Sequence, residues 1–78
     1  MTHNQLLLKF DEIIELVEDE KKQVAMRDDL SLIEPEIFST EELLVRFSSI
    51  LSGHLNSRPQ HEYEYAVFNA WNILLGEI

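Results

Sequence analysis

The chain has 78 residues, no cysteine, 45% hydrophobic residues and a formal net charge of −9 at pH 7. This composition is typical of one small folded domain, residues 1–78, and it excludes a disordered acidic tail, disulfide bonds and zinc held by thiolates. The pI near 4.5 disfavours direct binding to nucleic-acid phosphates or to an anionic membrane.

Short apolar runs and the lack of a targeting signal bear on where the chain acts. The runs at residues 6–8 and 73–75 are far shorter than the roughly 18 apolar residues that suggest a membrane span. The first residues also lack a basic stretch followed by the apolar core of a secretory signal. Together with the missing cysteines, these features predict a cytoplasmic protein.

The first predicted helix covers residues 3–27. Thr2 and Gln5 have the spacing of a capping box, in which each side chain accepts a hydrogen bond from a free backbone N–H at the helix start. Apolar residues recur at helical intervals from Leu6 to Val17 and predict the buried face. Acidic residues occupy the opposite face.

Residues 28–38 are predicted to connect the first helix to the second. Asp28 and Asp29 favour a turn, because acidic side chains at a helix C-terminus oppose the helix dipole. Pro35 disfavours helical geometry at the residue before it and favours a short helix or turn near residues 35–38. The apolar residues of this connection indicate that part of it packs against the core.

The second predicted helix begins after Ser39. Ser39 and Glu42 form another capping box, while Phe38 and Leu43 occupy the two positions of a hydrophobic staple. The helical pattern fades before a turn that is predicted at residues 56–59.

The third predicted helix runs from Pro59, a favoured first residue of a helix, to Gly76. Apolar residues cover more than half of its circumference, so it is predicted to be the central and most buried helix. Tyr65 and Phe68 fall outside its main apolar face and are candidate contacts with a partner or with a second copy of the chain. The fold class is therefore all-α, a small bundle of three main helices with the short helix or turn near residues 35–38.

No motif for catalysis or for a cofactor is present. His61 and Glu62 begin the zinc-protease pattern H-E-x-x-H, but the pattern fails because Tyr65 stands where the second histidine belongs. Gly53 and Gly76 are the only glycines, so the chain has no glycine-rich phosphate loop. No enzyme activity, metal site or cofactor is therefore predicted.

The negative charge is concentrated in residues 11–42, which hold twelve acidic and three basic side chains and thus the whole net charge of the chain. A charge confined to one segment speeds and selects association with a basic partner. The competing interpretation is that the acidic residues only keep the protein soluble.

In its size, charge and helical character the chain is similar to the bacterial immunity proteins that protect a cell from its own toxin. The resemblance implies an acidic protein that binds a basic, nuclease-like toxin and covers its active or substrate-binding cleft. It rests on no sequence motif, so no binding residue is carried over from that class. The candidate partner-binding residues follow from this chain's own pattern: Asp11, Glu12, Glu15, Glu18, Asp19, Asp28, Asp29, Glu34, Glu36, Tyr65 and Phe68.

Two alternatives stay open. One is a phage-type inhibitor that imitates nucleic acid and blocks a host defence protein, which predicts a broad and regularly spaced acidic surface. The other is a homodimeric helical adaptor, in which the third helix supplies an apolar seam and the charge serves solubility.

Overall fold

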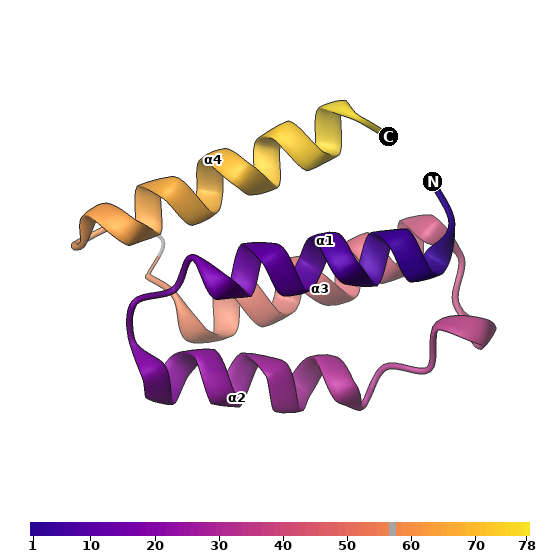
Figure 1. Cartoon of the computed structure of the whole chain (residues 1–78), viewed down its shortest axis with the longest axis horizontal. Coiled ribbons are helices and arrows are strands. Elements are labelled where there is room, and N and C mark those ends of the chain that lie inside the picture. The colour runs from indigo at the N-terminus through magenta and orange to yellow at the C-terminus, as the bar shows by residue number, and fades with distance from the viewer. Residues whose placement is uncertain (57) are drawn as a thin grey trace.

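A computed structural model describes residues 1–56 and 58–78 of the chain (Figure 1). In these residues it contains four α-helices and one short 3₁₀ helix: α1 (His3–Glu15), α2 (Glu20–Ser31), η1 (Pro35–Ile37), α3 (Thr40–His54) and α4 (Glu62–Gly76). The prediction of an all-helical bundle is confirmed, as is the short helix near Pro35. The turn predicted at residues 56–59 includes Ser57, which lies outside the described residues.

The single first helix predicted over residues 3–27 is wrong, because the chain reverses direction after α1 and starts again as α2. Two polar side chains explain the break. The side chain of Asp19 caps α2 by accepting a hydrogen bond from the backbone N–H of Lys22 at 3.2 Å. The amide nitrogen of Gln23 donates to the carbonyls of Ile14, Glu15 and Val17, each at 3.3 Å, and so satisfies the open end of α1.

The turn predicted at Asp28 and Asp29 is also wrong, because both residues belong to α2, which extends to Ser31. The unfavourable position of Asp29 near the helix C-terminus is offset by His54 of α3, whose Nε2 lies 2.7 Å from Asp29 Oδ2. This contact ties α2 to α3 beside the apolar packing between them.

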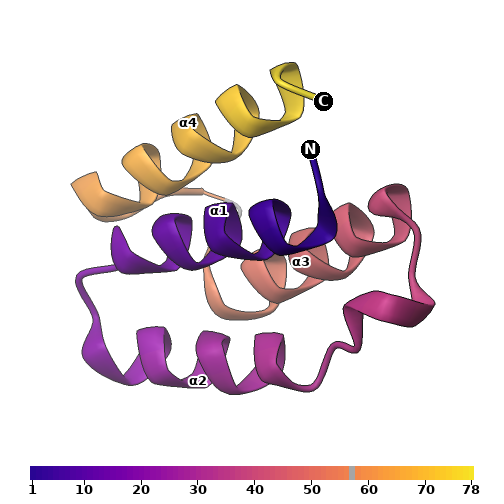
Figure 2. The ribbon, with the colours of Figure 1, turned by 45° about the vertical axis from the view of Figure 1, so that its right-hand side comes forward.

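The central helix of the bundle is α1, whereas α4 lies at its edge (Figures 1 and 2). In both views α1 runs between α2 and α4, with α3 packed behind it. The prediction that the last helix is the most buried one is therefore wrong. Because the extra chain reversal supplies α2 as a further helix, α1 packs against both α2 and α4, and Tyr65 and Ile73 of α4 remain exposed. This helix also begins at Glu62 rather than at Pro59.

Both predicted capping boxes are present, at Thr2 with Gln5 and at Ser39 with Glu42. They fix where α1 and α3 begin. Between α1 and η1, the His3 ring Nδ1 lies 2.9 Å from the carbonyl oxygen of Pro35, which holds the short helix against the start of the chain.

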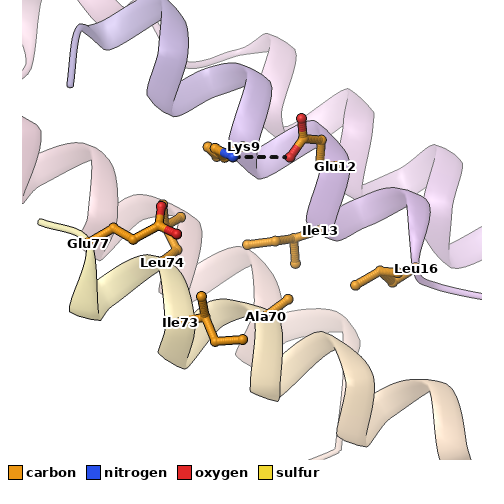
Figure 3. Close-up of a pocket in the computed structure, with 8 residues that line it drawn as sticks. All are labelled: Lys9, Glu12, Ile13, Leu16, Ala70, Ile73, Leu74 and Glu77. Atoms are coloured by element: carbon orange, nitrogen blue, oxygen red, sulfur yellow. Dashed lines mark ion pairs between the residues drawn. The ribbon is translucent and has the colours of Figure 1, made fainter.

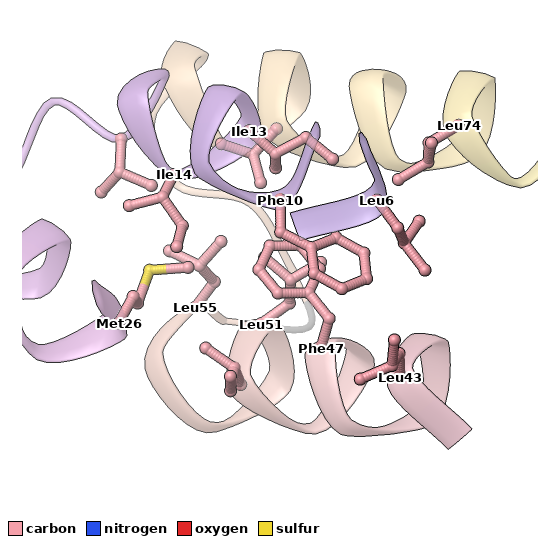
Figure 4. Close-up of a cluster of buried hydrophobic side chains, with 13 residues drawn as sticks. Leu6, Phe10, Ile13, Ile14, Met26, Leu43, Phe47, Leu51, Leu55 and Leu74 are labelled. Atoms are coloured by element: carbon pink, nitrogen blue, oxygen red, sulfur yellow. The ribbon is translucent and has the colours of Figure 1, made fainter. Parts of the chain in front are cut away.

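Two stacked phenylalanine rings form the centre of the core (Figure 4). The rings of Phe10 from α1 and Phe47 from α3 are nearly parallel, with centroids 4.2 Å apart, and both side chains are fully buried. Trp71 of α4 packs against Phe47 at a centroid distance of 5.5 Å, and Met26 of α2 is also fully buried in the core. Each α-helix thus contributes to one continuous apolar cluster.

Truncation of this ring stack tests the core. Phe47→Ala removes a fully buried ring and leaves a cavity, so we expect the free energy of unfolding to fall by about 3–5 kcal/mol in urea denaturation. Leu8→Ala, at an exposed position of α1, is the control and should change it by less than about 0.5 kcal/mol. Similar losses in the two variants would contradict this core.

Candidate partner-binding surface

The acidic residues of α1 that face α2 are neutralised within the chain. Arg27 of α2 donates from Nε to Asp11 Oδ1 at 3.0 Å and pairs through Nη2 with Glu15, while Nη1 donates to Gln23 Oε1 at 3.1 Å. The hydrogen bonds with Glu15 and then Asp11 raise the pKa of Arg27 above its already high usual value. Asp11 and Glu15, both candidates from the sequence, therefore hold α1 and α2 together as well as facing solvent.

Three further candidates also have partners inside the chain. Glu12 pairs with Lys9 one turn earlier at 3.6 Å, Asp19 caps α2, and Asp29 pairs with His54. These three carboxylates are already bound within the chain, so they are less available to a partner than the sequence alone predicts.

The remaining four acidic candidates are exposed and unpaired. In the part of the chain that the structure describes, the carboxylates of Glu18, Asp28, Glu34 and Glu36 accept no hydrogen bond and form no ion pair. Glu41, in the first turn of α3, shares this property although it was not among the candidates. Asp28 lies in the last turn of α2, where the helix dipole is itself negative, so the two add to the negative potential there.

Along residues 28–45, exposed apolar side chains alternate in the sequence with the free carboxylates of Asp28, Glu34, Glu36 and Glu41. Leu32 is 81% exposed, Ile37 68% and Val45 66%. We use the name connection face for the exposed apolar residues and the exposed, unpaired acidic residues from the last turn of α2 to the second turn of α3. They are Asp28, Leu32, Glu34, Glu36, Ile37, Glu41 and Val45.

A groove of about 340 Å³ opens beside the connection face, between α2 and α3. It is lined by Asp29, Leu32, Ile33, Phe38, Arg46, Ser49 and Ile50. A second hollow of about 550 Å³ adjoins it, shares Arg46 and Ser49 with it, and is bordered by Glu41, Glu42 and Val45. The unusually apolar connection was the sequence signal for this region, although it did not indicate a groove.

The two aromatic candidates lie apart from the connection face. Tyr65 is 62% exposed on α4, as its position outside the apolar face predicts, whereas Phe68 is only half-exposed and packs against the core. Because α4 lies across α1 from α2 and η1, Tyr65 is not grouped with the free carboxylates (Figures 1 and 2).

A different groove, of about 310 Å³, runs between α1 and α4 (Figure 3). Its floor and walls are mainly apolar and include Ile13, Leu16 and Ile73, and the charged residues at its rim are Lys9, Glu12 and Glu77. Since Lys9 and Glu12 pair with each other, this groove carries little net charge.

One carboxyl group is buried rather than exposed. Glu64, in the first turn of α4, has no exposed surface; its Oε1 accepts a hydrogen bond from the backbone N–H of Gln60 at 3.3 Å, and its Oε2 has no partner among the described residues. The positive end of the α4 dipole favours an acidic residue there, but the unpartnered oxygen costs stability.

Comparison of the chain with protein-family models, with curated proteins and with solved structures gives no match. Within residues 1–56 and 58–78, no group of three His, Cys, Asp or Glu side chains is placed to hold a metal ion. No helix in the same residues is long and apolar enough to cross a membrane. The connection face and its groove are the candidate site, because exposed apolar side chains and free carboxylates occur together in this part of the chain.

Substitution of two neighbouring acidic residues tests whether Asp19 stabilises the fold while Glu18 is only a surface charge. Asp19→Ala removes the cap of α2 and should lower the free energy of unfolding by about 1 kcal/mol. Glu18→Ala, which has the same change in charge at an exposed position, should change it by less than about 0.5 kcal/mol. Thermal denaturation followed by circular dichroism measures both, and equal effects would contradict the capping role.

Removal of the buried carboxyl group of Glu64 should stabilise the protein, in contrast to the loss expected for Asp19→Ala. Glu64→Met replaces an incompletely bonded polar group with an apolar one, so the free energy of unfolding should rise by about 1 kcal/mol. Glu62→Met, at the exposed position two residues earlier, is the control and should have little effect. A loss of stability in Glu64→Met would contradict the cost assigned to the unpartnered oxygen.

Proposed function

We propose that this chain is an acidic protein-binding inhibitor that neutralises a basic partner, in the manner of a bacterial immunity protein acting on a nuclease-like toxin. The observation that carries the proposal is the connection face, where free carboxylates and exposed apolar side chains alternate along residues 28–45. A binding surface of this kind combines long-range attraction with apolar contacts that hold the complex. On this proposal the protein acts in the cytoplasm, where it meets the toxin.

The mechanism follows from the charge of the partner's cleft. A nuclease binds phosphates with basic side chains, and carboxylates at Asp28, Glu34 and Glu36 would occupy the same basic sites and exclude the substrate. Because these carboxylates are not compensated inside the chain, they also accelerate association, by a factor of about 10 to 10³ that decreases with added salt. The inhibitor needs no catalytic group of its own.

The pairing on α1 favours this local binding face over imitation of nucleic acid. A nucleic-acid mimic presents many evenly spaced negative charges, whereas Asp11, Glu12 and Glu15 are paired with bases of the chain. The acidic surface is therefore interrupted on α1 and strongest from the last turn of α2 to the first turn of α3.

A homodimeric adaptor is the second candidate, and the groove between α1 and α4 supports it. Its apolar lining, the exposed side chain of Ile73 and the low net charge of its rim suit a second apolar helix (Figure 3). In that case Tyr65→Asp and Ile73→Asp would shift the chain from dimer to monomer in sedimentation equilibrium.

Charge reversal on the connection face tests the inhibitor. The tagged chain captures proteins from a lysate of its source organism at low salt, and the nuclease activity of a captured basic protein is measured with and without added chain. Glu34→Lys/Glu36→Lys should weaken binding of that protein at least about tenfold, because two attractions become repulsions. The low-salt advantage in association rate should shrink in parallel.

The control is Glu62→Lys/Glu77→Lys, which changes the net charge by the same amount at the two ends of α4. This variant should weaken binding less than about threefold, as expected for charges outside the interface. Equal losses in the two variants would show that only the total charge matters. Undiminished nuclease activity in the complex would contradict inhibition itself.

A further inference from the structure

The groove between α2 and α3 combines an apolar lining with a highly exposed leucine at its side. Its lining places the apolar side chains of Ile33, Phe38 and Ile50 around an opening beside Leu32, which is almost completely exposed. A leucine side chain that stays exposed to water contributes almost no hydrophobic free energy to folding. A partner that covered Leu32 and filled the groove would bury this apolar surface.

The charges around the groove define what can approach it. Glu41 and Glu42 line the adjoining hollow, and the exposed residues Asp28 and Glu34 are next in sequence to the lining residues Asp29 and Ile33. Glu36 lies instead in a separate hollow beside His3. Asp29 lies in the lining but is paired with His54. Acidic peptides, nucleic acids and anionic lipid surfaces are repelled by this arrangement, whereas lysine and arginine side chains are attracted.

One basic side chain interrupts the acidic surroundings. The guanidinium carbon of Arg46 lies 4.9 Å from the centroid of the Phe38 ring, over its face, and Arg46 lines both the groove and the hollow. This stacking holds the cation over part of the apolar floor. Arg46 would therefore repel a basic partner and cover part of its binding site.

We infer that this groove binds a basic, amphipathic protein segment that inserts an apolar side chain between Leu32 and Phe38 and places flanking lysines or arginines near the free carboxylates. The inference rests on the proposed function and assigns the anchor of the same interface. It also identifies Arg46 as a residue that limits affinity. The occupant is recognised by apolar contact and by charge together, and neither alone suffices.

Synthetic peptides test this requirement directly. The probe is a short amphipathic helical peptide of leucine and lysine, compared with one twin in which serine replaces leucine and another in which glutamate replaces lysine. Calorimetry gives the dissociation constants, and backbone amide shifts in NMR locate the site. Only the leucine–lysine peptide should bind well, with the largest shifts at Leu32, Phe38, Arg46 and Ser49.

Two matched variants locate the anchor. Leu32→Asp should weaken binding of the leucine–lysine peptide by about tenfold or more, although it adds a negative charge that attracts lysine. Leu8→Asp has the same change in charge at an exposed leucine of α1 and should leave the dissociation constant within about twofold. Arg46→Met retains an apolar cover on Phe38, removes the repulsion and should tighten binding by about two- to fivefold.

The possible failures are distinguishable. Equal binding of the serine–lysine twin would overturn the groove and leave the electrostatic part of the proposed function standing. Equal binding of the leucine–glutamate twin would overturn the proposed preference for a basic partner. Absence of binding by all three peptides, or dissociation of a homodimer by Leu32→Asp in sedimentation equilibrium, would also overturn this assignment of the groove.

Discussion

The chain reversal between α1 and α2, at residues 16–19, determines how the rest of the molecule is arranged. Gln23 donates to three carbonyl oxygens at the end of α1, and Arg27, one turn later on α2, holds Asp11 and Glu15. These contacts join two helices that would otherwise continue as one. With α2 folded back, Met26 enters the core and the chain continues toward η1 and α3.

The same reversal divides the negative charge into two parts. On α1 and at the chain reversal all the carboxylates except Glu18 serve the fold: two bind Arg27, one pairs with Lys9 and one caps α2. From the last turn of α2 onward the acidic side chains have no such partners within residues 1–56 and 58–78, apart from the capping box at Glu42, the contact of Asp29 with His54 and the bond from Gln60 to buried Glu64. A charge that contributes little to folding remains available for a partner. For this reason the proposed interface lies on the connection face rather than along α1.

The local features of the fold could be predicted from the sequence, because their causes lie within a few residues. The capping boxes at Thr2 and Ser39 and the short helix at Pro35 are examples. The break after α1 could not be predicted from periodicity, since Val17 and Met26 continue the apolar pattern and no glycine or proline interrupts it. Its cause is the contact of side chains with backbone groups six to nine residues away.

Because the break between α1 and α2 was not predicted, the pairing of acidic candidates on α1 with Arg27 of α2 was not predicted either. Whether Asp11 is free or paired depends on Arg27, sixteen residues later in the chain, which a continuous helix would have placed far from it. The sequence identified the acidic segment and the apolar character of the connection, and it identified Tyr65 as lying off the core face of its helix. It could not indicate the groove between α2 and α3, because that groove exists only when two separate helices pack together.

The distance between α1 and α2 is the most direct test of this arrangement. The chain has no cysteine, so Asn4→Cys/Ser31→Cys can be spin-labelled at two exposed positions and nowhere else. A hairpin of packed helices, whose axes lie about 8–10 Å apart, predicts a label separation below about 25 Å by pulsed electron paramagnetic resonance. A separation near 40 Å, the length of one continuous helix of about 1.5 Å per residue, would contradict the reversal and the division of charge that depends on it.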